Sequence, residues 1–189
     1  MNKLNNCLAL SVLGLVVLAT GCKKDDDEDP APTPTPTPSL YSQVGGTTMV
    51  ADPAHPGQMI EQGYLSFRSV VDSTIFVIAA DPQLQPFFAV LLGEVTGGNT
   101  TNLAILSENL TEFFSVAAGG TNFTYSGLNM VDAHNSTGNP RMSGLANNAA
   151  FDRFIADVVT GAQQNSVPDN IITQVGALIE TLRDDVVQQ

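Results

Sequence analysis

The sequence predicts an all-α domain of four main helices and several short ones, and three observations lead to this fold class. Apolar side chains recur at steps of three and four residues in four separate windows, the spacing that lines one face of a helix. No window of comparable length alternates apolar and polar residues with the two-residue period of a strand. Loops rich in Gly and Asn separate the windows, and the sequence contains no internal repeat.

Signals at the ends of the four windows define the predicted helices. The first window starts near Gly63 and ends at Asp81-Pro82, and the second is followed by Gly119-Gly120, a typical C-cap. The third lies before Gly161, and the fourth has Pro168 near its start, where the missing amide hydrogen costs nothing. The apolar positions are Leu65, Val71, Ile75 and Ile78; then Leu103, Leu106, Leu110, Phe113, Phe114 and Ala117; then Phe151, Phe154, Ile155, Val158 and Val159; and finally Ile171, Val175, Leu178, Ile179, Leu182 and Val186.

The charge of the chain excludes nucleic acid as a partner. The 189 residues carry a formal net charge of −12, with a pI near 4.1, whereas a phosphate backbone requires a basic face. From Ser39 to the end there are four Arg, fourteen acidic residues and no Lys. Hydrophobic residues make up 43% of the chain, which is enough for a packed core.

Residues 1–21 have the features of a signal peptide. The apolar run Cys7–Ala19 is too short to span a bilayer, for which about 20 residues are needed. It ends in Leu18-Ala19-Thr20-Gly21-Cys22, which resembles the bacterial lipobox, a small-residue cleavage site followed by the cysteine that receives the lipid. We expect Cys22 to be lipidated and to anchor the chain to a membrane; the alternative is an ordinary signal peptide in which Cys22 has no role. Both Cys precede the domain, which therefore has no disulfide.

Residues 22–38 are expected to form a linker, which leaves residues 39–189 for the domain. A charged block is followed by Pro-Thr alternation, which favours an extended polyproline II spacer of about 3.1 Å per residue. The acidic run after Cys22 resembles the export signal of surface lipoproteins in Bacteroidota-type bacteria, and a plain solvated linker explains it equally well. We expect a cell-envelope lipoprotein of the outer membrane. If the acidic run is an export signal, the protein is expected to be exposed on the cell surface.

Candidate chemistry in the domain centres on its two histidines. His55 lies between two prolines in Asp52–Gly57, a sequence that predicts a turn. His134 ends the short segment Met130–His134 between the second and third windows. The sequence has no CxxC, HExxH, P-loop or GxGxxG motif, and no Ser-His-Asp arrangement can be argued. From the residues alone, a packed histidine and a metal ligand both remain open for His134.

Short motifs along the domain occur in a distinctive order. They are Leu40–Gly46 (LYSQVGG), Val70-Val71-Asp72, Ala80-Asp81-Pro82, Phe87-Phe88, Phe113-Phe114, Gly119-Gly120, Tyr125-Ser126-Gly127, Met130, Ala133-His134, Phe151-Asp152 and Val167-Pro168-Asp169. In order and spacing they resemble the group I truncated haemoglobin family over about 150 residues. The resemblance implies a truncated globin-like fold, a two-over-two helical sandwich.

The resemblance also implies a cofactor and a site. His134 would be the proximal ligand of a haem b iron, and the helix Leu103–Ala117 would cover the opposite, distal side. A diatomic gas (O2, NO or CO) would be the partner of the iron. The implied wall residues around the haem are Phe87, Phe88, Leu106, Leu110, Phe113, Phe114, Met130 and Phe151.

The chain departs from this family at the distal side. A tyrosine that hydrogen-bonds dioxygen in the family corresponds to Thr74-Ile75 here, and Leu106, Asn109 and Leu110 stand where Gln or His is common. Ile75, Leu106 and Leu110 therefore predict an apolar distal pocket, with Thr74 or Asn109 as its hydrogen-bond donor. The sequence predicts a membrane-tethered haem protein that binds a diatomic gas. A nitric-oxide dioxygenase or peroxidase-like enzyme and a haem-free globin-like binding module are the alternatives, and nothing indicates a redox partner.

Overall fold

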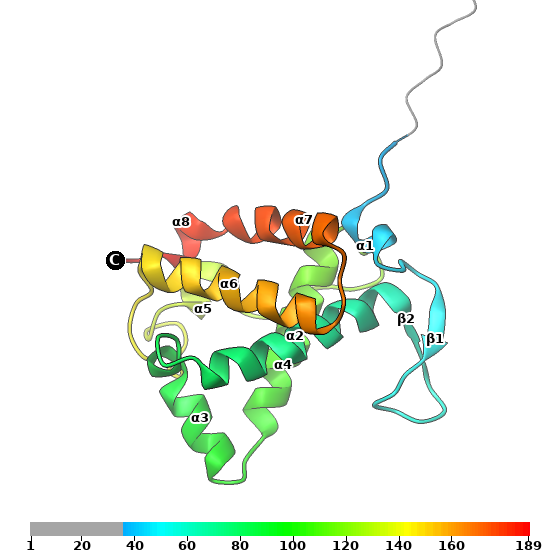
Figure 1. Ribbon diagram of the computed structural model, residues 1–189. Helices are drawn as coiled ribbons and strands as arrows, with labels where there is room; N and C mark the ends of the chain where they lie inside the picture. The colour runs from blue at the N-terminus through cyan, green and yellow to red at the C-terminus, as the bar shows by residue number, and fades with distance from the viewer. Residues whose placement is uncertain (1–35) are drawn as a thin grey trace, which may run out of the picture. The chain divides into compact units, whose positions relative to one another are not determined.

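Eight α-helices build the described part of the chain, residues 36–189, in this computed structural model (Figure 1). The predicted signal peptide, the lipidation site Cys22 and nearly all of the linker lie outside the described residues. The main helices are α2 (Gln62–Ala80), α4 (Thr101–Ala117), α6 (Asn148–Gln164) and α7 (Asp169–Glu180). The smaller elements are α1 (Leu40–Gln43), β1 (Met49–Ala51), β2 (Met59–Glu61), the 3-10 helix η1 (Gln85–Phe88), α3 (Ala89–Thr96), α5 (Met130–Ala133) and α8 (Arg183–Val186). The predicted all-α class with four main helices is confirmed.

Helix α2 is the centre of the arrangement. It packs against α4 on one side and α6 on the other, and α6 in turn packs against α7, which gives two helix pairs (Figure 1). By length and composition α2 is the one helix among residues 36–189 that could cross a membrane. Its Phe67, Val71 and Ile78 are instead buried against the other helices, so its apolar character is that of a core helix.

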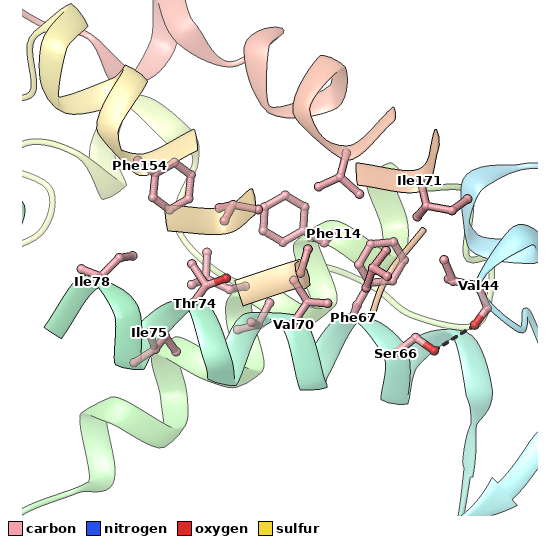
Figure 2. Close-up of a pocket in the computed structure, with 16 residues that line it drawn as sticks. Val44, Ser66, Phe67, Val70, Thr74, Ile75, Ile78, Phe114, Phe154 and Ile171 are labelled. Atoms are coloured by element: carbon pink, nitrogen blue, oxygen red, sulfur yellow. Dashed lines mark hydrogen bonds between the residues drawn. The ribbon is translucent and has the colours of Figure 1, made fainter. Parts of the chain in front are cut away.

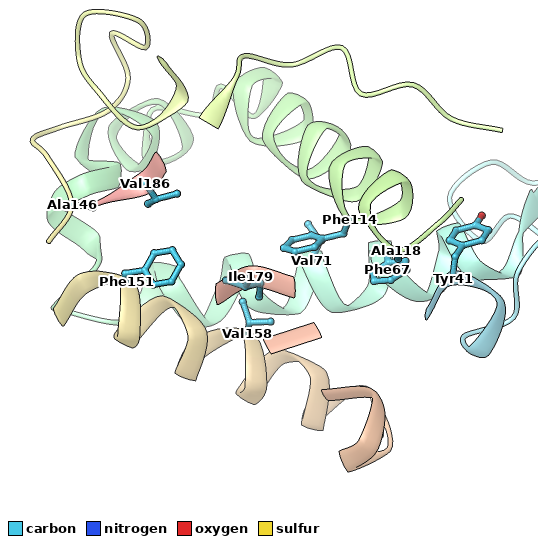
Figure 3. Close-up of a cluster of buried hydrophobic side chains, with 10 residues drawn as sticks. All are labelled: Tyr41, Phe67, Val71, Phe114, Ala118, Ala146, Phe151, Val158, Ile179 and Val186. Carbon is cyan, nitrogen blue, oxygen red and sulfur yellow. The ribbon is translucent and has the colours of Figure 1, made fainter. Parts of the chain in front are cut away.

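The core is a continuous cluster that runs from α1 to α8 (Figure 3). Phe67 of α2 lies between Tyr41 and Phe114, with ring centroids 6.3 and 6.4 Å apart in the two pairs. At the other end of the cluster, Phe151 and Val186 come together from α6 and α8. Large aromatic side chains thus fill the middle of a domain that has no disulfide.

Gly161 allows α2 and α6 to approach closely. A Cβ added at Gly161 would lie 2.9 Å from the backbone nitrogen of Thr74, closer than any side chain tolerates. The sequence predicted that the third helix ends before Gly161, and this is wrong because α6 continues to Gln164. The glycine serves the contact between helices rather than a helix end. Gly119, by contrast, has a φ of 96° just after α4, as its predicted C-cap role requires.

Two further features differ from the sequence prediction. Residues 49–61 form a small antiparallel hairpin, in which Val50 pairs with Ile60, and His55 lies in the predicted turn between the strands. The fourth window is broken after α7, since the chain turns at Thr181 and Leu182 before α8 begins. The break directs Val186 into the core beside Phe151, which one straight helix could not do.

Candidate functional site

A cavity of about 440 Å³ lies among α2, α3, α4, α5, α6 and α8. Its lining is almost wholly apolar, and the polar side chains along it are few. They are Asn102, Asn109, Tyr125, His134, Asn139 and Arg141. Ligand sites in proteins are typically apolar hollows of about 300–1,000 Å³ with a small number of polar groups. The cavity has the size and chemistry of a site for a mainly apolar small-molecule ligand.

The cavity brings together all but one of the residues proposed for the site from the sequence. The lining includes Ile75, Phe87, Phe88, Leu106, Asn109, Leu110, Phe113, Phe114, Met130, His134 and Phe151. They come from α2, η1, α4, α5 and α6 and from the residue that caps α5. Residues up to 76 positions apart in the sequence thus surround one hollow.

Thr74, proposed as a distal donor, does not line this cavity. It is buried and lines a small apolar cavity of about 50 Å³ between α2, α6 and α7 (Figure 2), which shares part of its lining with the large cavity. In Figure 2 Thr74 points from α2 toward α6, and the next residue, Ile75, lines both this cavity and the large one. The Oγ1 of Thr74 has no hydrogen-bond partner among the described residues. Of the two proposed hydrogen-bond donors, only Asn109 lines the large cavity.

His134 is oriented by the short helix that precedes it. The side chain of Asn129 caps the start of α5 by accepting a hydrogen bond from the Asp132 amide, and His134 is the C-cap. The Nδ1 of His134 lies 2.8 Å from the carbonyl oxygen of Met130. Because a carbonyl can only accept, Nδ1 carries the hydrogen, and Nε2 carries the lone pair when the ring is neutral. Burial lowers the pKa of His134 below its ordinary value of 6.5, which favours the neutral ring.

Two side chains fasten the backbone of α5 in place. Asn139 donates to the carbonyl of Ala133 over 3.0 Å, and Gln188, near the C-terminus, donates to the carbonyl of Val131 over 2.8 Å. The backbone of Gln188 also donates to the carbonyl of Ala146 over 3.0 Å. A helix of four residues has little stability of its own. These hydrogen bonds, from the segment after α5 and from the C-terminal residues, therefore fix the position of His134 at the cavity wall.

Asn109 differs from the other amides along the cavity. The side chain of Asn102 donates to Glu94, and that of Asn139 donates to Ala133. The hydroxyl of Tyr125 donates to the carbonyl of Leu128. The carboxamide of Asn109 has no hydrogen bond within the part of the chain that the structure describes. It is the polar group on the α4 side of the cavity that is available to a ligand.

A bare metal ion has no suitable site here. Among residues 36–189 no group of three or more His, Cys, Asp or Glu side chains is placed to bind one.

Sequence reasoning missed several residues of the cavity. Leu91, Leu92 and Val95 line it from α3, and the 135–147 segment adds Asn139, Arg141 and Met142. Leu182 and Val186 complete the lining from the C-terminal end. The apolar character of the residues in α3 and at the C-terminal end was visible in the sequence, but only the packing of α3 and α8 shows which cavity these residues face.

Comparison with solved structures identifies the fold class. Truncated hemoglobin from Tetrahymena pyriformis in its Fe(III) form matches with a TM-score of 0.56 and 22% sequence identity, over 80% of this chain and 100% of that one. Variants of the same protein in the Fe(III) form match equally well. No family model matches the sequence, and no curated protein matches it either. The domain has a truncated-globin fold, a helical sandwich with the cavity between its layers.

Proposed function

We propose that this protein binds haem b through His134 and uses the iron to bind a diatomic gas. The observation that carries the proposal is the orientation of His134, which lines the large cavity and whose Nδ1 lies against the carbonyl of Met130, while Nε2 has no hydrogen bond among residues 36–189. Histidine ligands of metals commonly donate the other ring nitrogen in this way, which fixes the tautomer and the ring orientation. The truncated-globin fold supports the same assignment. The order of short motifs, which includes Ala133-His134, supports it as well, and group I is proposed from these motifs alone.

The residues of the cavity fit this cofactor. A porphyrin is a large, flat, apolar ring, and the lining offers aromatic surface from Phe87, Phe88 and Phe113. When bound, haem would supply an iron centre that can bind a diatomic gas, and His134 would hold that iron. His134 contributes the nitrogen lone pair, and the aromatic side chains exclude water from the cavity.

The distal side of the cavity favours gases that need few hydrogen bonds. Ile75, Leu106 and Leu110 supply apolar surface there, and Asn109 supplies the available amide. Dioxygen accepts hydrogen bonds when it binds iron, whereas CO and NO depend on them less. We infer that dioxygen is released faster than in a pocket with several donors. The same paucity of donors and acids argues against peroxidase-like acid–base chemistry.

A tether to the membrane is part of the proposal. Lipidation of Cys22 after removal of residues 1–21, with residues 22–38 as the spacer, would place the domain at the surface of the cell envelope. Replacing Cys22 with Ala should release the full-length protein from the membrane fraction of expressing cells. Retention of the Cys22→Ala variant on membranes would mean that another segment anchors it.

The experiment that tests haem binding is a titration with haemin. The purified protein should give a sharp Soret band at one equivalent and a higher melting temperature, because haemin binds the folded state. His134→Ala should abolish the sharp band. His55→Ala is the matched control, since His55 is the other histidine of the chain and lies in the hairpin turn. An unchanged spectrum in His134→Ala would refute the assignment, and a stable apo-protein that binds no haemin would support a haem-free binding module.

A further inference from the structure

Arg141 is the cationic side chain along the large cavity. The lining is otherwise apolar or neutral in the part of the chain that the structure describes, apart from the titratable His134. Arg141 belongs to the 135–147 segment, which connects α5 to α6. Asn139, Arg141 and Met142 of this segment line the cavity together with His134, and the Arg141 side chain is 46% exposed.

The 135–147 segment holds Arg141 at a fixed place relative to His134. The side-chain oxygen of Asn139 accepts from the amide of Arg141 over 3.1 Å. The side-chain nitrogen of Asn139 donates to the carbonyl of Ala133, the residue before His134, over 3.0 Å. Farther along, the amide of Ser143 donates to the carbonyl of Phe87 over 3.0 Å, which fastens the segment to η1. The side chain of Asn139 therefore links the backbone of Arg141 to the end of α5 that carries His134.

The other cations of the domain are engaged elsewhere. Arg153 pairs with the buried Asp81 and Asp157, and Arg183 pairs with Asp152 and Glu180. Arg68 lies 3.8 Å from the buried Asp52, near the hairpin. The sequence has no lysine after residue 24. Arg141 is therefore the arginine that lines the cavity among residues 36–189, while the guanidinium of Arg183 lies 4.4 Å from the ring centroid of the lining residue Phe151.

The present partner of Arg141 can be exchanged at little cost. Its Nε lies 3.3 Å from Oε1 of Glu94, and the Arg141 side chain is 46% exposed. Ion pairs of such exposure contribute little stability. Glu94 also accepts a hydrogen bond from Asn102 over 2.8 Å, so it keeps a partner if Arg141 turns away. The carboxylate of Glu94 thus pairs with the Arg141 guanidinium in the way that a carboxylate of a ligand would.

We propose that Arg141 binds a carboxylate of the ligand in this cavity, which for haem b is a propionate side chain. The inference rests on the proposed haem function and adds the residue that recognises the charged edge of the cofactor. His134 and Arg141, joined through Asn139, then fix two points of the ligand, the iron and one carboxylate. Glu94 competes for the same guanidinium and weakens the binding of an anionic ligand.

The test compares haemin with haemin dimethyl ester, in which both carboxylates are neutral. The affinity ratio of haemin to the ester is measured for the intact protein and for Arg141→Gln. We expect the ratio to fall about fivefold in Arg141→Gln, the size of a partly exposed ion pair. Arg68→Gln is the control and should leave the ratio unchanged. Glu94→Gln should raise the affinity for haemin but not for the ester. Melting curves of the apo-proteins check that each variant is folded.

The outcomes separate the two proposals. A ratio that is the same in Arg141→Gln and in the intact protein, with both porphyrins bound through His134, overturns the role of Arg141 and leaves haem binding intact. A fall in the ratio that Arg68→Gln reproduces would show a general charge effect and also overturn it. If the intact protein binds neither porphyrin, the proposed function and this inference both fail.

Discussion

Asn109→Leu is the substitution that examines the distal side of the cavity most selectively. Leu has the same branching at Cγ and the same number of side-chain heavy atoms as Asn, and it is a good helix former, so α4 should keep its position. The change removes the amide at the cavity wall that has no hydrogen bond within the described residues. It therefore deletes a donor for the gas without stripping any other side chain of its partner.

The expected change in the dioxygen dissociation rate follows from the hydrogen bonding of the Asn109 amide. A neutral hydrogen bond contributes about 0.5–1.5 kcal/mol, and Asn109 breaks no internal hydrogen bond to form it. Loss of the donor should speed dioxygen dissociation from the haem-loaded protein about two- to tenfold. Dissociation of CO should change less, because that ligand depends less on donors.

The assay is stopped-flow displacement of dioxygen by excess CO, followed by displacement of CO by NO. Asn102→Leu is the matched control, since Asn102 also lines the cavity but already donates to Glu94. Equal acceleration in the two variants, or an unchanged rate in Asn109→Leu, would refute the assignment of Asn109 as the distal donor.

The remaining predictions concern α2, the buried ion pair and the C-terminal contact. Ile75→Tyr should slow dioxygen dissociation, because its hydroxyl enters the large cavity; an unchanged off-rate would mean that position 75 does not face the gas. The Arg153 guanidinium holds the pKa of Asp81 below its usual range, so ionised Asp81 stabilises the fold above about pH 4 and loses this effect as the pH falls. Asp81→Asn should lower the urea midpoint at pH 7, and the difference from the intact protein should shrink in more acidic buffer; a difference constant with pH contradicts this. Gln188→Ala removes a hydrogen bond to α5 and should speed haem transfer to apomyoglobin several-fold, whereas Gln189→Ala should not.

The main helices were predictable because their information is local. Leu106, Leu110 and Phe114 recur at steps of four residues, and this spacing alone indicates a helix with one apolar face. Gly119 could be assigned as a helix end because it follows directly after this apolar window in the sequence. Gly161 could not be interpreted from its neighbours, because its role is a contact with Thr74, 87 positions earlier in the chain.

The site was predictable only in part. The order of short motifs indicated His134 and most of the wall residues, whereas nothing in the local sequence shows which side of α2 faces the cavity. Thr74 and Ile75 are adjacent, and the packing of α6 decides that Thr74 points away from the cavity. Arg141 lies in a loop whose position depends on hydrogen bonds to α5 and η1. Such contacts between distant segments carry no periodic signal.

The most direct test of the account is the iron–histidine vibration of the ferrous protein, measured by resonance Raman spectroscopy. We expect this band in the haem-loaded protein and in His55→Ala, and we expect its loss in His134→Gly. Added imidazole should enter the space left in His134→Gly and restore an iron–imidazole band. A band that persists unchanged in His134→Gly, or that disappears in His55→Ala, would contradict the claim that His134 ligates the iron.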